Sequence, residues 1–193
     1  MKILWLHILN AVAKTGNRQI AANYLNITPD LVHSTVRRVE KNWELVLFHR
    51  APWTNQTRER LWNVADDRAR IIMHHIDAML REMTLVEETA FIIHRHNPDI
   101  KTRYSLRTSD IKKVLTLEGN SISMTAQILN VGRPSIETSL AKAERWLGIR
   151  FYCDWRSGNE KLKVLTKDGE RLQPYLAKID SHFEEILELT KGE

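Results

Sequence analysis

Hydrophobic residues recur at the three- and four-residue spacing of amphipathic helices through most of the chain. In the first half, this spacing and the residues that interrupt it predict helices over 3–14, 19–25, 29–43 and 64–96. Two short stretches of strand character, 45–50 and 59–62, lie between the last two of these helices. Because a polar segment joins these stretches, they predict a β-hairpin.

The second half repeats this pattern at a distance of 104 residues. The shift places residues 22–27 over 126–131 and Glu40 over Glu144. A period of about 100 residues is the size of one small domain, so we interpret the chain as a tandem duplication with its joint near Pro98. The elements expected in the second copy are helices over 109–118, 123–129, 134–147 and 167–190, and strands over 149–153 and 161–165.

Each copy then has the element order of a winged helix-turn-helix: a helix, two helices joined by a tight turn, a hairpin and a long closing helix. Pro29 and Pro134 stand in the first turn of the third helix, where a missing N–H costs nothing, and Ser109 with Asp110 offers an N-cap in the second copy. We expect a mainly α fold with small β wings. Its parts are a winged domain (1–63), a long helix (64–96), a connector (97–108), a second winged domain (109–166) and a C-terminal helix (167–193).

Composition and charge narrow the function classes. Of the 193 residues, 42% are hydrophobic and 27% charged, which excludes wholesale disorder, and a single cysteine excludes a disulfide scaffold. Without an apolar run near the roughly 18 residues that span a bilayer, we expect a soluble, cytoplasmic, nucleoid-associated protein with no membrane partner. Residues 1–63 hold nine Lys/Arg against four acidic residues, and 108–163 hold nine against six. These two basic blocks favour two polyanion-binding heads.

The segments 16–25, 27–29, 37–40 and 45–50 resemble the N-terminal DNA-binding domain of LysR-type bacterial transcription regulators. The second copy repeats the resemblance at Pro134, Glu144 and 147–152, and at 165–169 it carries the threonine and glycine that open the family's linker helix. The first copy departs from the family at 63–66. The resemblance implies binding to double-stranded DNA and pairing through the linker helices. No effector-sensing domain follows either copy, so a small-molecule effector is not expected.

The third helix of the first copy has a buried stripe and a polar face. Val32, Val36, Val39 and Trp43 fall on one side, so polar residues face outward. Arginine can pair with guanine, serine and histidine can reach base edges, and lysine suits phosphates. Asp30 either accepts from a cytosine amino group or favours the helix N-terminus. The expected DNA-binding residues are Thr28, Pro29, Asp30, His33, Ser34, Arg37, Arg38 and Lys41.

In the second copy the stripe is Ile136, Leu140, Ala143 and Leu147, and the opposite face is less basic. We therefore expect the two heads to bind unequally, with the first reading more of the DNA sequence. The DNA-binding residues expected on this helix are Arg133, Ser135, Thr138, Lys142 and Arg145.

The hairpins are long enough to act as wings on DNA, where arginine suits the minor groove and small polar groups suit the backbone. Trp53 and Trp155 are expected to fold back over their hairpins. The expected DNA contacts are Thr54, Asn55 and Arg58 in the first wing, and Arg156 and Lys161 in the second.

The long helices carry apolar residues at alternating steps of four and three, the spacing of a coiled-coil seam. They therefore indicate pairing, either between two chains as a homodimer or between the two copies of one chain as a pseudo-dimer, with further self-association also open. The expected pairing residues are Ala69, Ile72, Ile76, Met79, Met83, Val86 and Ile93 in the first helix, and Leu172, Leu176, Ile179, Phe183 and Ile186 in the second.

Sequence motifs of catalysis and cofactor binding, such as the P-loop and the paired-cysteine metal motif, do not occur. Cys153 is interpreted as a structural thiol, and the histidines at 74–75 and 94–96 as solvated or interface residues rather than metal ligands. The sequence therefore predicts no enzymatic activity, no cofactor and no metal.

These features together predict a sequence-preferring double-stranded DNA-binding protein, a transcription regulator of bacterial or mobile-element origin without a sensor domain. One alternative is a plasmid-type replication initiator, which also uses tandem winged helices. Another is a tandem winged-helix scaffold of chromosome-condensation complexes, which binds protein; the basic recognition faces count against it.

Overall fold

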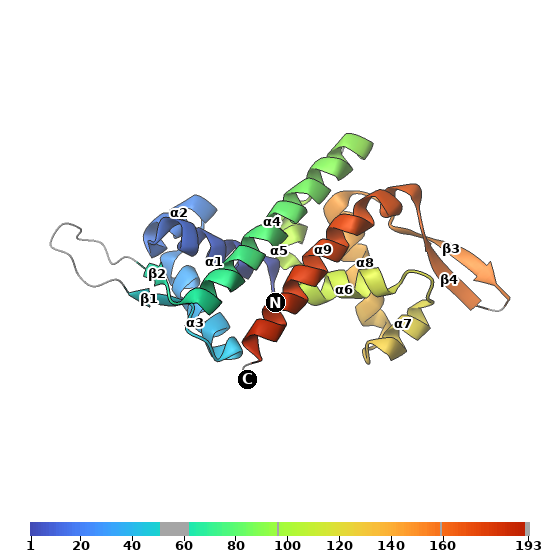
Figure 1. Ribbon diagram of the computed structural model, residues 1–193. Helices are drawn as coiled ribbons and strands as arrows, with labels where there is room; N and C mark the ends of the chain where they lie inside the picture. The colour runs from blue at the N-terminus through green and yellow to red at the C-terminus, as the bar shows by residue number, and fades with distance from the viewer. Residues whose placement is uncertain (51–61, 96, 159, 192–193) are drawn as a thin grey trace. The chain divides into compact units, whose positions relative to one another are not determined.

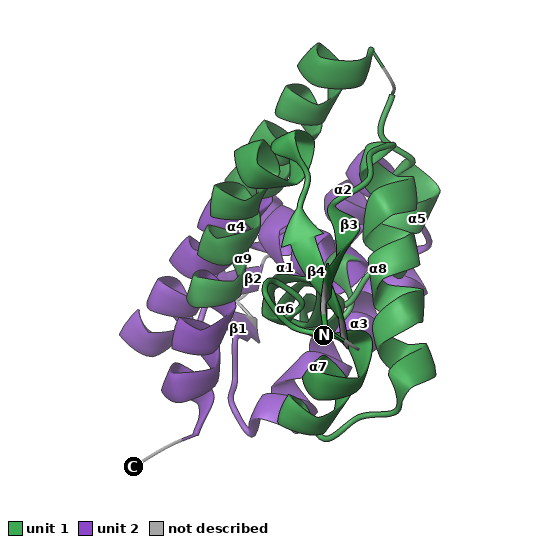
Figure 2. Ribbon diagram, turned by 90° about the vertical axis from the view of Figure 1, so that its right-hand side faces the viewer, with its two compact units in different colours: residues 1–3, 81–181 green, residues 4–80, 182–193 purple. Residues whose placement is uncertain are grey.

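The computed structural model describes residues 1–50, 62–95, 97–158 and 160–191, which group into two units (Figures 1 and 2). Unit 1 contains residues 1–3 and 81–181, and unit 2 contains residues 4–80 together with the end of the chain from 182. Each unit combines one helix-turn-helix head with parts of two long helices. No helix within the described ranges is long and apolar enough to cross a membrane.

The head of unit 2 consists of three helices and a small hairpin. Asn17 caps the second helix by accepting hydrogen bonds from two backbone N–H groups, and Thr28 caps the third. Asn26 adopts a left-handed conformation with φ 53°, which ends the second helix and starts the tight turn. The elements are α1 (Ile3–Thr15), α2 (Arg18–Leu25), α3 (Pro29–Trp43), β1 (Phe48–Arg50) and β2 (Trp62–Val64).

The core of this head is formed by the apolar faces of its helices. Val32, Val36 and Val39 are buried as the periodicity predicts, whereas Trp43 at the helix end is half-buried. Helix α1 contributes the largest share of the other apolar side chains. Other buried apolar residues of the head are Leu6, Ile8, Leu9, Ala11, Val12, Ala21, Ala22, Leu47 and Phe48.

The strand boundaries in this head differ from the prediction. A strand was expected from residue 45, but β1 begins at Phe48 because the N–H groups of Leu45 and Leu47 donate to Glu40 at the end of α3. The second strand extends to Val64, which pairs with Phe48. The long helix expected from residue 64 therefore begins three residues later, as α4 (Asp67–His94).

Unit 1 holds a second head with the same order of elements. Its hairpin pairs Tyr152 with Leu165 at one end and Ser157 with Glu160 at the other. Trp146 and Phe151 are its largest fully buried side chains. The elements are α6 (Thr108–Thr116), α7 (Ile122–Ile128), α8 (Arg133–Leu147), β3 (Tyr152–Ser157) and β4 (Glu160–Leu165), followed by α9 (Lys167–Thr190).

The expected connector, 97–108, contains a helix that the sequence pattern did not reveal, α5 (Ile100–Ser105). Asp99 caps this helix by accepting from the N–H groups of Lys101 and Thr102. The next helix, α6, begins at Thr108, so Ser109 and Asp110 are not its N-cap. Asp110 instead lies in the first turn and accepts from the backbone N–H of Arg107 at 2.9 Å.

Both heads use the same contacts at positions 104 residues apart. The Leu47 N–H donates to the Glu40 carboxylate at 2.9 Å, and the Phe151 N–H donates to the Glu144 carboxylate at 2.9 Å. Each glutamate therefore fixes the turn from the third helix to the strand that follows. The same offset relates the backbone bonds from Ile27 to Ala22 and from Val131 to Ala126, and the left-handed residues Asn26 and Asn130, and Glu44 and Gly148.

Helices α4 and α9 contact each other within each unit, and the order of the contacts makes them antiparallel (Figure 1). Within unit 2 the contacts join Arg68 to the Leu189 carbonyl (2.6 Å) and His75 to Glu185 (2.9 Å). Within unit 1 they join Glu82 to Lys178 (3.3 Å) and His94 to Asp168 (2.7 Å).

The apolar residues of the expected seam are largely buried. Exceptions are Ile93 and Phe183, which are half-buried. Met73 and Leu80, which lie beside the seam, are also buried, so the apolar face of α4 is wider than the heptad pattern indicates. The buried seam residues are Ala69, Ile72, Ile76, Met79, Met83, Val86, Leu172, Leu176, Ile179 and Ile186.

A polar cluster within unit 1 ties α4 to the second head. The Glu87 carboxylate on α4 accepts from the Arg103 guanidinium of α5 at 2.9 and 3.1 Å and from the Trp146 indole N–H of α8 at 2.7 Å. The Glu87 and Arg103 side chains are only 15% and 14% exposed. Solvent therefore screens this ion pair weakly, and removing either side chain leaves the other charge buried without its counter-charge.

We expect Glu87→Ala to lower the free energy of unfolding by about 3–5 kcal/mol, because it leaves the Arg103 charge and the Trp146 N–H without their acceptor. Chemical denaturation monitored by tryptophan fluorescence and circular dichroism measures the change. Glu88→Ala is the matched control, since Glu88 is the exposed neighbour on the same helix and should change stability by less than about 0.5 kcal/mol. Equal stabilities of the two variants would contradict a structural role for the cluster.

Candidate nucleic-acid interface

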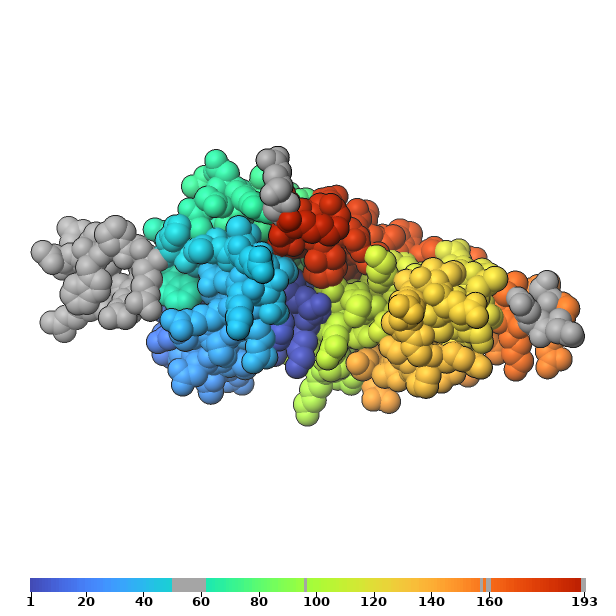
Figure 3. Space-filling view, turned by 90° about the horizontal axis from the view of Figure 1, so that it is seen from below, coloured from blue at the N-terminus to red at the C-terminus, as the bar shows by residue number. Residues whose placement is uncertain are grey.

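The outer face of α3 presents polar and basic side chains to solvent. Asp30, Ser34, Arg37 and Lys41 are exposed, on the side of the helix opposite the buried valines. This part of the chain forms the cyan surface in Figure 3. An exposed helix face with an arginine and a lysine one turn apart has the chemistry to read a base edge and hold a phosphate.

Other residues expected at this interface make contacts within the head. The His33 ring is half-buried and lies edge-on to Trp62 of β2, with 6.1 Å between the ring centroids. The Arg38 guanidinium stands 5.7 Å from the centre of the Trp5 ring of α1. Thr28 caps α3 by accepting from the Leu31 N–H at 3.3 Å. These three side chains thus position the helix as well as border its outer face.

The first wing cannot be compared with its prediction, because Thr54, Asn55, Arg58 and Trp53 lie outside the described residues. The base of that hairpin is described. Its strands pair from Phe48 with Val64 to Arg50 with Trp62.

The outer face of α8 in unit 1 is less available than that of α3. Arg133, Thr138 and Arg145 are exposed, as expected, but Ser135 and Lys142 are half-buried. The Lys113 ammonium donates to the Ser135 hydroxyl at 2.9 Å, and the Lys142 ammonium stands 3.6 Å from the Asp110 carboxylate. Contacts within the head therefore already engage the side chains of Ser135 and Lys142, which were predicted to bind DNA.

Asp110 organises this network. Burial raises the pKa of its carboxyl, but hydrogen bonds from the Ser139 hydroxyl (2.6 Å) and the Arg107 N–H, together with the charges of Lys142 and Lys113, outweigh burial and hold the pKa below its ordinary value. The carboxylate stays ionised at neutral pH. It neutralises part of the positive charge that the sequence assigns to this face.

Two hollows on the surface of the second head contain some of the predicted residues, whereas Arg145 and Arg156 line neither; this part of the chain is yellow to orange in Figure 3. A hollow of about 430 Å³ brings Arg133 and Lys161 together. Another, of about 560 Å³, contains Ser135, Thr138 and Lys142. Further lining residues include Ser121, Ser123, Lys163 and the acidic Asp154 in the first hollow, and Lys2, Arg107, Lys113 and the acidic Asp110 in the second.

The second wing is described in part, and one expectation for it is wrong. Trp155 was expected to fold back over the hairpin, but its side chain is 63% exposed. The residue pairs with Leu162 in the middle of a two-stranded ribbon. Arg156 and Lys161 are exposed on the same ribbon, and so is Cys153. Because neighbouring strand residues point to opposite faces, the wing presents Trp155 on one face and the paired cations Arg156 and Lys161 on the other.

Comparison with known proteins bears on the first head. Neither the curated proteins nor the solved structures provided a match to the chain. Residues 3–57 match the family described as bacterial regulatory helix-turn-helix protein, lysR family. The match covers α1, α2, α3 and β1, so over these elements the head of unit 2 is similar to the helix-turn-helix of that family.

Proposed function

We propose that the protein is a sequence-preferring double-stranded DNA-binding transcription regulator of bacterial or mobile-element origin. The observation that carries this proposal is the LysR-type match over residues 3–57 combined with the exposed face of α3 that presents Arg37 and Lys41. Its role is binding rather than catalysis. The first head is followed along the chain by a second head rather than by an effector-binding domain.

The second head is a tandem copy of the first in this proposal. Support comes from the equal order of elements and from contacts that recur at a fixed offset, such as the glutamate bonds of Glu40 to Leu47 and of Glu144 to Phe151. Backbone geometry of this kind follows from a shared local sequence. The two long helices pair within one chain, since residues of α4 contact residues of α9 in each unit.

Selection of bound sequences from a random duplex library tests the function. A regulator enriches one or a few defined sites. Clustered direct repeats at a replication origin, if the recovered site occurs that way in its genome, would favour a replication initiator instead. Failure to enrich any sequence, with no duplex binding at low salt, would favour a protein-binding scaffold and reject the proposal.

The two heads contribute unequally, and a pair of arginine variants tests this. Arg37→Ala should weaken binding to the selected site by about 1–3 kcal/mol and relax the preference at one base pair, as expected for an arginine that reads guanine. Arg145 is exposed on α8. Its replacement by alanine should weaken binding to all sequences alike.

Competition assays with the selected site and its single-base variants measure both effects. Arg70→Ala is the control, because Arg70 is an exposed arginine on α4 that pairs with Asp67 rather than lying on a recognition helix. It should bind like the wild type. An equal loss of sequence preference in Arg37→Ala and Arg145→Ala would contradict the asymmetry between the heads.

A further inference from the structure

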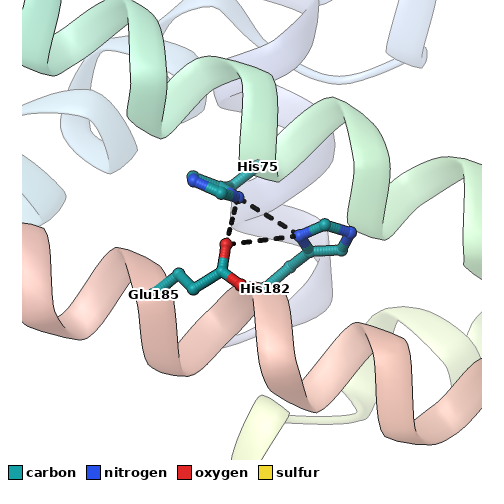
Figure 4. Close-up of side chains that lie close together, drawn as sticks. All are labelled: His75, His182 and Glu185. Atoms are coloured by element: carbon teal, nitrogen blue, oxygen red, sulfur yellow. Dashed lines mark hydrogen bonds and ion pairs between the residues drawn. The ribbon is translucent and has the colours of Figure 1, made fainter.

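Three metal-ligating side chains converge in unit 2 where α4 meets the last turns of α9 (Figure 4). His75 comes from α4, and His182 and Glu185 come from α9, one helical turn apart. The His75 Nδ1 lies 3.2 Å from the His182 Nδ1 and 2.9 Å from a Glu185 carboxylate oxygen. The same carboxylate oxygen lies 3.8 Å from the His182 Nδ1.

We propose that His75, His182 and Glu185 form a binding site for a divalent transition metal, with zinc as the ion that fits best. Tetrahedral zinc bonds of about 2.0–2.2 Å place neighbouring ligand atoms roughly 3.3–3.6 Å apart. The three separations in this cluster, 2.9, 3.2 and 3.8 Å, bracket that spacing. Two imidazoles and one carboxylate are also the ligand set of catalytic zinc sites that keep an open fourth position.

Hydrogen bonds cannot join all three atoms of this cluster in pairs, whereas one metal ion can be bound by all three. Each imidazole nitrogen either donates or accepts, so the His75 Nδ1 cannot donate a proton to both neighbours at once. A metal ion accepts a lone pair from all three atoms together. Metal binding takes the neutral form of each imidazole, whose ring nitrogen then offers a lone pair.

Burial also suits an open metal site. The His75 and His182 side chains are 16% and 27% exposed, and Glu185 is 51% exposed. The imidazoles are thus held in place by packing, while the carboxylate side faces solvent, from which a water molecule can supply the fourth ligand. Ligands at i and i+3 on one helix, completed from a facing helix, are a known arrangement in helical bundles.

A metal ion at this site would bridge α4 and α9 within unit 2, the unit that contains the first head. An ion held by α4 and α9 joins the end of the chain to the helix that follows the first head. Metal binding would stabilise unit 2, because the ion binds the folded unit and not the separated helices. The proposal is independent of DNA binding and stands or falls separately from it.

Titration of untagged, metal-free protein with Co²⁺, followed by displacement with Zn²⁺, tests the site. The wild type should bind one ion per chain, with the intense visible absorption of tetrahedral Co²⁺, and Zn²⁺ should abolish this absorption and raise the thermal midpoint. His75→Ala and His182→Ala should each lose at least about 100-fold in affinity, since even outer-sphere partners of metal ligands contribute 10–100-fold. Zinc should no longer raise their thermal midpoints.

Two further variants separate loss of ligands from loss of folding. Glu185→Gln keeps the shape of an exposed side chain, so it should unfold like the metal-free wild type but bind at least about 10-fold more weakly. His74→Ala removes the adjacent, exposed histidine and should bind like the wild type. The proposal is overturned if the wild type binds no ion in this range, or if His74→Ala loses as much affinity as His75→Ala, or if Glu185→Gln loses none.

Discussion

Ile76→Asp is expected to separate α4 from α9 and to abolish tight DNA binding. Ile76 is fully buried in the seam of α4, one residue from the His75 contact with α9. Exposing a buried isoleucine costs about 1.5–3 kcal/mol, and an unpaired carboxylate placed there adds a desolvation cost. The total is a large part of the roughly 5–15 kcal/mol that stabilises a typical domain. Each helix-turn-helix head should remain folded, because most of its buried apolar residues lie outside α4 and are unchanged.

The matched control is Ile71→Asp, which makes the same substitution on the same helix at a residue that is 47% exposed. Its stability should change by less than about 0.5–1 kcal/mol. Thermal unfolding and duplex-binding titrations compare the two variants. Wild-type stability and affinity in Ile76→Asp would show that the seam does not hold the heads in their binding arrangement.

Sedimentation of the same proteins distinguishes the two forms of pairing. Contacts between α4 and α9 within one chain predict that the wild type sediments as a single chain and that Ile76→Asp keeps this mass. A homodimer through the same seam would instead halve its mass in the variant. Further association through exposed apolar residues, such as Phe91 and Ile92 on α4, would appear as a concentration-dependent increase in mass.

Local signals in the sequence were sufficient to predict the third helix of each head. Thr28 and Pro29 mark the start of α3, and its valines follow a regular helical stripe, so its bounds, Pro29–Trp43, agree with the prediction. The pairing seam was predictable for the same reason, since burial on a long helix leaves a regular pattern. Periodicity is strongest where one face of a long element is buried.

Short elements and distant contacts were not predictable in this way. Helix α5 has six residues, too few for a periodic pattern, and it depends on the cap that Asp99 provides. The late start of β1 depends on Glu40, whose carboxylate takes backbone N–H groups that a longer strand would use. Whether a backbone N–H donates to a side chain or to a neighbouring strand depends on contacts of the folded chain, which leave no periodic pattern in the sequence.

The sequence did not indicate which charged and polar side chains would be engaged by contacts within the protein. Lys142 and Ser135 were selected as DNA ligands because of their places on a helix, yet Asp110 and Lys113 from another helix engage them. The cluster of His75, His182 and Glu185 was not predicted for the same reason, because His75 and His182 are 107 residues apart in the chain. Adjacent histidines at 74–75 indicated nothing about which ring would meet a partner.

A salt titration of duplex binding most directly tests the claim that this protein binds DNA through its basic heads. Removing one side chain that neutralises a phosphate should make the slope shallower by about 1, so Lys41→Ala, which removes an exposed lysine of α3, should have a shallower slope than the wild type. If the heads neutralise about 6–8 phosphates, log K against log salt should have a slope of about −5 to −7, and affinity should fall about 10³–10⁴-fold between 50 and 200 mM salt. Binding measured by fluorescence anisotropy on a labelled duplex that falls this steeply is the predicted result; a nearly flat titration, or no binding at low salt, would contradict the account.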